Sequence, residues 1–201
     1  MALTFSVADF QSVIQKRGGL VQPNKYSVYI KTPSKLATRG LETDFPLLVE
    51  ATSLPSRSLA TADNRTYGPL RKIARESIYA DLAMTFMLTQ DMAIKNYFDQ
   101  WLNLIQSDYQ YDPSYYDDYT TDIYIALLHD NQKNVIPANI VNKKSGNYSI
   151  RIEEAFPISV GDVALSFADV NTYAKLQITF AYRRWVNEES RSRFTVRHAS
   201  N

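Results

Sequence analysis

The sequence contains two histidines, and one of them is followed directly by an aspartate. His129 and Asp130 could form a general base and the residue that orients it, but the neighbouring residues are those of a solvated turn. His198 lies in a polar C-terminal stretch and has no partner at the spacing of a metal site or a catalytic triad. We therefore interpret neither histidine as catalytic.

Adjacent carboxylates are a second candidate for acid–base chemistry. Glu153 and Glu154 are neighbours, as are Asp117 and Asp118, so on a strand they would point to opposite faces and could not share one reacting atom. The chain has 6 Gly and 0 Cys, which argues against a phosphate-binding glycine loop and excludes thiolate metal sites and cysteine nucleophiles. We expect no enzyme, no cofactor and no metal, and an enzyme with an atypical site stays the alternative.

The composition predicts one domain without a strong electrostatic field. A chain of 201 residues that is 45% hydrophobic can bury one good core. We place this domain at residues 1–185, followed by a polar C-terminal extension at 186–201. The formal net charge of +1 offers no global attraction to nucleic acid or to an anionic membrane. Without a membrane-spanning run or a signal peptide, we expect the protein to be in the cytoplasm where it is made.

Hydrophobic periodicity predicts a mainly β fold with flanking helices, of the α+β class. Alternating residues indicate strands near 26–31, 148–153 and 174–183, further strands are predicted near 47–52 and 83–88, and the run at 123–128 predicts a strand that is apolar on both sides. Ile94, Tyr97, Phe98 and Trp101 form the apolar stripe of a helix that Asp91 can cap. A shorter amphipathic helix at 6–16 is interpreted as closing one edge of the core, with docking onto a neighbouring subunit as the alternative.

The segment 56–76 is rich in cations and poor in large apolar residues, so burial in a core cannot hold it in place. Around the turn signal at 67–70 it predicts a projecting loop or hairpin. The segment 56–76 is either a solvated, mobile loop or an arm that contacts acidic patches on other subunits. The candidate interface residues in this segment are Arg57, Arg65, Arg71, Lys72 and Arg75.

A second candidate interface is the segment 107–122, which is rich in tyrosine and aspartate. Tyrosine combines contact area with a polar tip, so we select Tyr111, Tyr115 and Tyr116 as interface candidates. The aspartates do not form a calcium loop. Counted from Asp112, the sixth and twelfth positions lack the Gly and Glu that such a loop requires.

Four stretches in this order resemble the tail tube family of contractile-tailed bacteriophages. They are QPNKYSV at 22–28, EATSLP at 50–55, YFDQW at 97–101 and FPISVGDV at 156–163, the last followed by a long strand that ends at Trp185. The last stretch is the most specific, because it places a turn of the pattern Pro-x-x-Val-Gly between two strands. The resemblance extends from the N-terminal helix to Trp185.

The resemblance implies a sandwich or barrel-like domain whose strands join an inter-subunit β-barrel in a hexameric ring. Such rings stack into the inner tube of a phage tail, within a contractile sheath, and DNA passes through the lumen without specific binding. The implied partners are further copies of the chain and the sheath, baseplate and tail-terminator proteins. The implied location is the virion tail, assembled in the host cytoplasm.

The residues leave two other functions open. Because the chain is longer than a minimal tube subunit, a tube-like baseplate or tube-initiator protein is one alternative. A single-stranded nucleic-acid-binding β-domain is the other, although the tyrosines stand among aspartates that would repel a phosphate backbone. For a conduit we expect lumen-facing strand positions without a net positive charge, since a basic wall would retain phosphates.

Overall fold

The computed structural model describes residues 6–36, 41–65, 68–107, 113–128, 148–168 and 170–187. The strands are β1 (Tyr26–Ile30), β2 (Val49–Thr52), β3 (Arg57–Asn64), β4 (Arg71–Tyr79), β5 (Leu82–Met87), β6 (Thr121–Leu127), β7 (Ser149–Val160), β8 (Lys175–Ala181) and β9 (Arg184–Asn187). The helices are α1 (Val7–Lys16), the single 3₁₀ turn η1 (Leu41–Thr43), α2 (Phe45–Leu48), α3 (Ala93–Ile105) and α4 (Tyr116–Tyr119). The predicted mainly β fold with flanking helices is confirmed.

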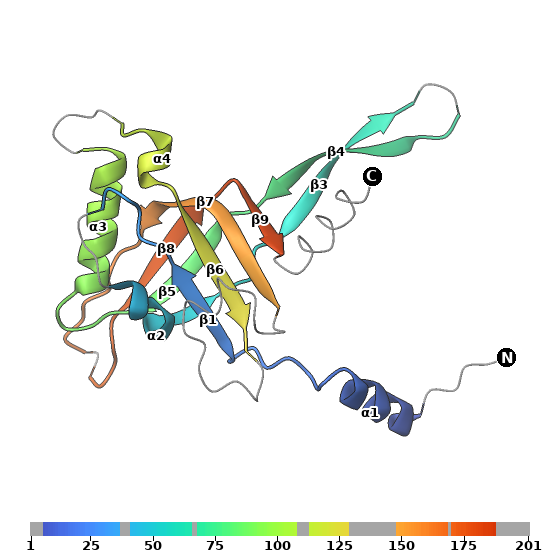
Figure 1. The fold of residues 1–201 in the computed structure, drawn as a ribbon, viewed down its shortest axis with the longest axis horizontal. Helices are drawn as coiled ribbons and strands as arrows, with labels where there is room; N and C mark the ends of the chain where they lie inside the picture. The colour runs from blue at the N-terminus through green and yellow to red at the C-terminus, as the bar shows by residue number, and fades with distance from the viewer. Residues whose placement is uncertain are drawn as a thin grey trace, which may run out of the picture.

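The body is built from two antiparallel sheets that share β7 (Figure 1). The first half of β7 pairs with β6 and β9, and β6 pairs with β1. The second half pairs with β8, which continues to β5 and β2. Glu154 lies between the two halves with a φ of 57°. One strand therefore passes from one sheet to the other, which gives the body a barrel-like shape.

The continuous course of β7 corrects the turn predicted around Pro157. Pro157 stands in register with Phe180 inside the strand, and β7 continues to Val160. Proline has no N–H group, so it is tolerated where one side of a strand is unpaired. In the described part of the chain, residues 156–160 pair with β8 alone, and Pro157 therefore does not interrupt the sheet.

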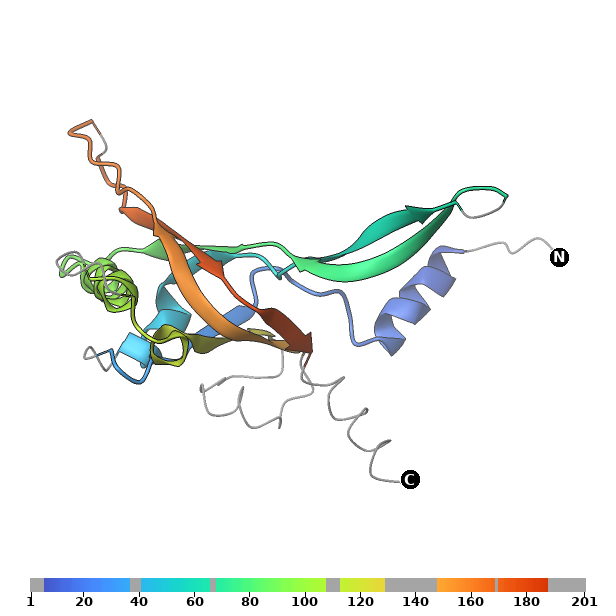
Figure 2. The same ribbon diagram turned by 90° about the horizontal axis from the view of Figure 1, so that it is seen from above.

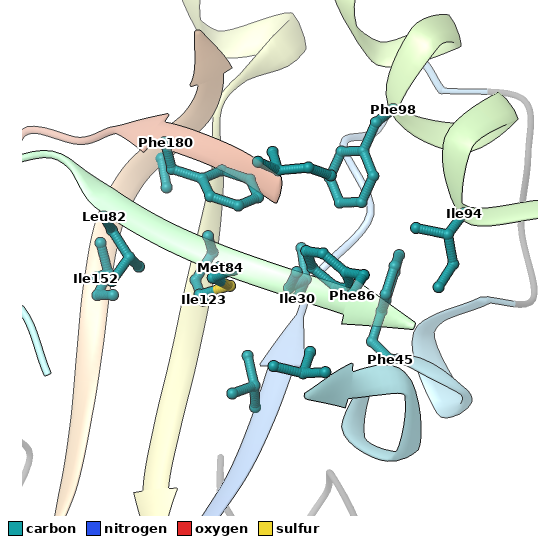
Figure 3. Close-up of a cluster of buried hydrophobic side chains, with 14 of the residues drawn as sticks. Ile30, Phe45, Leu82, Met84, Phe86, Ile94, Phe98, Ile123, Ile152 and Phe180 are labelled. Carbon is teal, nitrogen blue, oxygen red and sulfur yellow. The ribbon is translucent and has the colours of Figure 1, made fainter. Parts of the chain in front are cut away.

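The core lies between the two sheets, and α3 covers it with its predicted apolar stripe. Ile94, Tyr97, Phe98 and Trp101 are fully buried, which confirms the face predicted for this helix. Figure 3 shows Phe98 directed toward the strands and close to Phe86, with ring centroids 5.3 Å apart. The alternation predicted for β8 is also confirmed.

Two local predictions need correction. The first two residues of the strand predicted at 47–52 are the end of α2, where a proline in the first turn and buried Phe45 favour a helix over an extended chain. The N-cap of α3 is Met92, in a left-handed conformation, and not Asp91. The Asp91 carboxylate still accepts a hydrogen bond from the Ala93 N–H at 3.3 Å.

The N-terminal helix stands away from the body. Although α1 has the predicted capping box between Ser6 and Asp9, none of its residues is buried. Figure 2 shows the helix beyond the sheets, joined to β1 by an extended segment. The interpretation that α1 closes an edge of the core is therefore wrong.

Gly161, directly after β7, leads to our first prediction. Its N–H donates to the Gln177 carbonyl at 2.7 Å, and a Cβ at this position would lie 2.8 Å from the same oxygen. Gly161→Ala is expected to lower the free energy of unfolding by about 1–3 kcal/mol, because the two backbones must move apart. Urea unfolding measures the loss. Ser159→Ala, an exposed change in β7, is the control and should alter stability by less than about 0.5 kcal/mol.

Candidate assembly interface

The cation-rich segment forms a two-stranded hairpin, β3–β4, that projects from the body (Figure 2). No residue of either strand is buried. Isolated two-stranded hairpins are at best marginally stable in water. We therefore expect another chain to cover this exposed hairpin, whose strands have 8 and 9 residues.

The predicted cations divide between the base and the distal part of the hairpin. Arg71 and Lys72 begin β4 opposite Asn64 and Asp63, and Arg65 directly follows β3. A register shift leaves Arg75 and Glu76 opposite the single residue Ala60. The side chains of all four distal cations are exposed. These four are Arg65, Arg71, Lys72 and Arg75.

Arg57 lies at the base of the hairpin and has a different environment. Its guanidinium donates to the Ser77 hydroxyl at 2.9 and 3.1 Å and lies 6.0 Å from the centre of the Tyr79 ring. The Tyr79 ring in turn contacts Tyr182, whose hydroxyl donates to the Ala80 carbonyl at 2.7 Å. Arg57 thus belongs to the junction between hairpin and body, which orients the hairpin.

The Tyr182 hydroxyl makes this junction sensitive to alkaline pH. Burial, and to a smaller extent the charge of Asp81, raises the pKa of Tyr182 to about 12. Because the pKa is higher in the folded protein than near 10 in the unfolded chain, this contribution to stability is complete below about pH 10 and is lost between about pH 10 and 12. Urea unfolding at pH 8 to 11 should show that Tyr182→Phe removes part of the alkaline loss. An identical pH slope in both proteins would contradict the assignment.

Tyr115 and Tyr116 stand at the start of α4, which lies beside α3 at the end of the body away from the hairpin (Figure 1). Tyr115 precedes α4 and is 85% exposed, whereas the Tyr116 ring packs on Tyr119 and Phe156. Tyr111 lies outside the described residues. The structure therefore places the tyrosines and the cations on two separate surfaces.

The outward face of the sheet β2–β5–β8 carries mostly small or polar side chains, and its charges balance. Lys175 forms a salt bridge of 2.5 Å with Glu50, and this ammonium holds the pKa of the Glu50 carboxyl below its usual value. The net charge of the pair is therefore zero. The strand registers also place Ala51, Ala83, Thr85, Met87, Ser159, Gln177, Thr179 and Ala181 on this face, together with Phe156, whose ring contacts Tyr116 and Tyr119.

This sheet also ends in strands with an unpaired side. Among the described residues, β2 pairs with β5 alone and residues 156–160 of β7 pair with β8 alone. The Tyr26 hydroxyl donates to the carbonyls of Val49 and Glu50, so part of β2 is satisfied within the chain. Unpaired strand edges pair readily with other chains.

Sequence reasoning did not identify the connection between β7 and β8 as a candidate contact surface. Leu165, Phe167 and Val170 are largely exposed in it, and Phe167 contacts solvent over its whole side chain. A groove of about 690 Å³ lies beside this connection, lined in part by Leu165 and Gln177. The signal was available as large apolar residues in a segment without helical or strand periodicity.

In the described ranges, no three His, Cys, Asp or Glu residues gather as they would around a metal ion. Across the same ranges, no helix combines the length and the apolar character needed to cross a membrane.

Comparison with solved structures identifies the class of fold. The chain is similar to the sheath/tube terminator of the extracellular contractile injection system PVC, with 16% identity, a TM-score of 0.58, and coverage of 84% of this chain and 96% of the other. It is also similar to the tube-terminating cap of the anti-feeding prophage, with 17% identity, a TM-score of 0.57 and 94% of each chain covered. A chain of the PVC sheath–tube complex matches at 17% identity and a TM-score of 0.56, over 92% of this chain and 99% of the other. The chain has the fold of tube and terminator proteins of contractile injection systems.

The family model described as phage tail tube protein matches residues 21–188. The chain therefore belongs to the phage tail tube protein family, and it is a structural subunit of a tail. A comparison with curated protein sequences gives no match. The predicted family is confirmed, and the matched residues include the hairpin and the sheet with unpaired edges.

Proposed function

We propose that copies of this chain close into hexameric rings and stack into a hollow tube, which conducts DNA inside a contractile sheath. The main support is the sheet β2–β5–β8, whose outward face is balanced in charge and whose edge strands are unpaired on one side. Pairing these edges between copies would satisfy the unpaired backbone groups of the monomer and join the sheets into a continuous barrel. The outward face would then line the lumen.

The composition of this face suits a conduit. Its one salt bridge, Lys175 with Glu50, adds no net charge, and Thr85 and Gln177 are neutral. Phosphates are held mainly by cations whose contacts release counterions, so a neutral wall lets a duplex slide. The lumen would act without specific binding of DNA and without catalysis.

The other proposed surfaces serve contacts between copies and with the ends of the tail. The hairpin β3–β4, with its distal cations, and α4, with the exposed Tyr115 and Tyr116 at its start, lie at opposite ends of the folded molecule (Figure 1). Contacts in a stacked assembly require such separate surfaces. The proposed partners are the sheath, baseplate and tail-terminator proteins. Assembly would take place in the host cytoplasm.

Electron microscopy of the purified protein tests the proposal. We expect tubes of constant diameter that lengthen with protein concentration. Rings that do not stack would instead favour a tube-initiator or terminator role at one end of the tail. Protein that stays monomeric at all concentrations and shifts single-stranded DNA in a gel would contradict the proposal and favour the nucleic-acid-binding alternative.

Labelling of an engineered cysteine tests which face lines the lumen. Because the natural chain has 0 Cys, Gln177→Cys and Thr85→Cys each introduce a single thiol on the proposed lumen face. Both should react with a long polymer-linked maleimide in free subunits and lose most of that reactivity in long tubes. Asn103→Cys, at an exposed position of α3 outside the proposed contact surfaces, is the control and should react equally in subunits and in tubes. Equal reactivity of Gln177→Cys in tubes and in subunits would contradict the assignment.

A further inference from the structure

The helix α1 carries an apolar stripe that no described part of its own chain covers. Val7, Phe10 and Val13 are all largely exposed, with Phe10 at 64%. Helices of about ten residues are marginal in water without tertiary contacts, even when they are well capped. The capping box of Ser6 and Asp9 sets the start of the helix but buries no apolar surface. The stripe therefore requires a surface from outside the body of its own chain.

One face of the β3–β4 hairpin presents such a surface. The register places Ala62 beside Ile73, and Ile78 lies on the same side nearer the base. The exposed fractions of Ile73 and Ile78 are 49% and 51%. Ser58 pairs with Ile78 and alternation adds Ala60, so three small residues of β3 lie on the side of the two isoleucines of β4, which Arg75 and Glu76 separate at the register shift. Such a shallow apolar strip suits the side of a helix.

We propose that α1 of one copy packs against this apolar face of the β3–β4 hairpin in a second copy. The inference rests on the proposed function, because it assigns two of the surfaces through which subunits would join. Within one chain the two elements project from the same side of the body and lie well apart in Figure 1. The exposed linker 17–25, with positive φ angles at Gly18 and Gly19, can span at most about 30 Å. With that reach, α1 would contact a copy that lies beside its own body.

The charges of the two elements set the direction of the contact. Asp9 lies in the first turn of α1 and Lys16 in its last turn. On the hairpin, Arg71 and Lys72 make the distal end of β4 cationic, whereas Arg75 and Glu76, closer to the base, offset each other. Asp9 would therefore face the distal end and Lys16 the base. A helix with one acidic and one basic end fits a protein surface better than an anionic membrane, which binds helices with a strongly cationic face.

Disulfide cross-linking between two differently tagged copies tests the contact. One copy carries Phe10→Cys and the other Ile73→Cys, and these are the only thiols because the natural chain has 0 Cys. A disulfide requires Cα atoms within about 7 Å, so we expect the mixed disulfide at least about tenfold above that of a control pair. The control pairs Ser12→Cys, on the polar side of α1, with Ile73→Cys. Both changes are on exposed residues and leave the core intact.

The outcomes separate this inference from the proposed function. Tubes that form without an excess of the mixed disulfide overturn the α1 contact and leave the tube role standing. A mixed disulfide without tubes supports the contact while contradicting the tube. With both cysteines in one chain at high dilution, a compact monomeric product would show that α1 folds onto its own hairpin, and this would overturn the inference. Failure of the mixed disulfide, together with co-sedimentation of the protein with anionic lipid vesicles, would overturn it as well.

Discussion

Trp101→Ala is expected to lower the free energy of unfolding by about 3–5 kcal/mol. The side chain is fully buried, and its ring stacks on Phe98 with centroids 5.9 Å apart and planes 13° apart. It also contacts Phe180 across the core. Truncation would leave a cavity that α3 cannot close, because the Tyr97 and Phe98 rings of the helix are held by Phe45 and Phe86 of the body.

The polar part of Trp101 adds to the expected loss. Its indole N–H donates to the Tyr119 carbonyl at 2.8 Å and so ties α3 to the end of α4. Domains are commonly stable by only about 5–15 kcal/mol, so the variant should lose a large share of its stability. Urea unfolding followed by far-ultraviolet circular dichroism measures this without relying on the missing fluorophore.

Two control variants calibrate the Trp101 result. Trp101→Phe keeps most of the apolar volume and should lose less than Trp101→Ala. Tyr115→Ala, at an 85% exposed position, should change stability by less than about 0.5 kcal/mol. A loss below about 1 kcal/mol for Trp101→Ala would contradict the position of α3 as the cover of the core.

Reversing Arg71, Lys72 and Arg75 to glutamate together is expected to abolish tube growth and leave the fold intact. All three side chains are exposed on β4, and no ion pair joins them to the rest of the described chain. Like charges brought together across an interface cost several kcal/mol, and each 1.4 kcal/mol corresponds to a factor of ten in affinity. The concentration needed for assembly should therefore rise at least about 100-fold.

Sedimentation and electron microscopy at a fixed salt concentration measure the effect of the reversal. The matched control exchanges the cations among themselves, as Arg71→Lys, Lys72→Arg and Arg75→Lys, and should still assemble. In the reversed variant, Glu at position 72 would stand opposite Asp63, so a small local destabilisation of the hairpin is expected. Normal tubes from the reversed variant, with urea unfolding unchanged, would show that these cations do not contact other subunits.

The sequence alone determined the elements whose patterns are local. The stripe of α3 and the alternation of β8 follow from periods of 3.6 and 2 residues, and both lie in the structure where they were predicted. The family likewise followed from short motifs in a fixed order, and the match over residues 21–188 confirms it. The capping box of α1 was also predictable, because Ser6 and Asp9 interact within one turn.

Only the tertiary structure decided which surfaces stay uncovered. The stripe of α1 has the same pattern as a core helix, and its exposure depends on where the linker 17–25 directs it. The candidate cations and tyrosines were known by residue type, yet the fold places β4, which begins at Arg71, and α4, which follows Tyr115, at different ends of the molecule (Figure 1). The passage of β7 from one sheet to the other, and with it the unpaired edge at 156–160, depends on strand pairs distant in the sequence. Periodicity reports which side of an element is apolar, whereas the contacts that cover that side come from residues far away in the chain or from another copy of it.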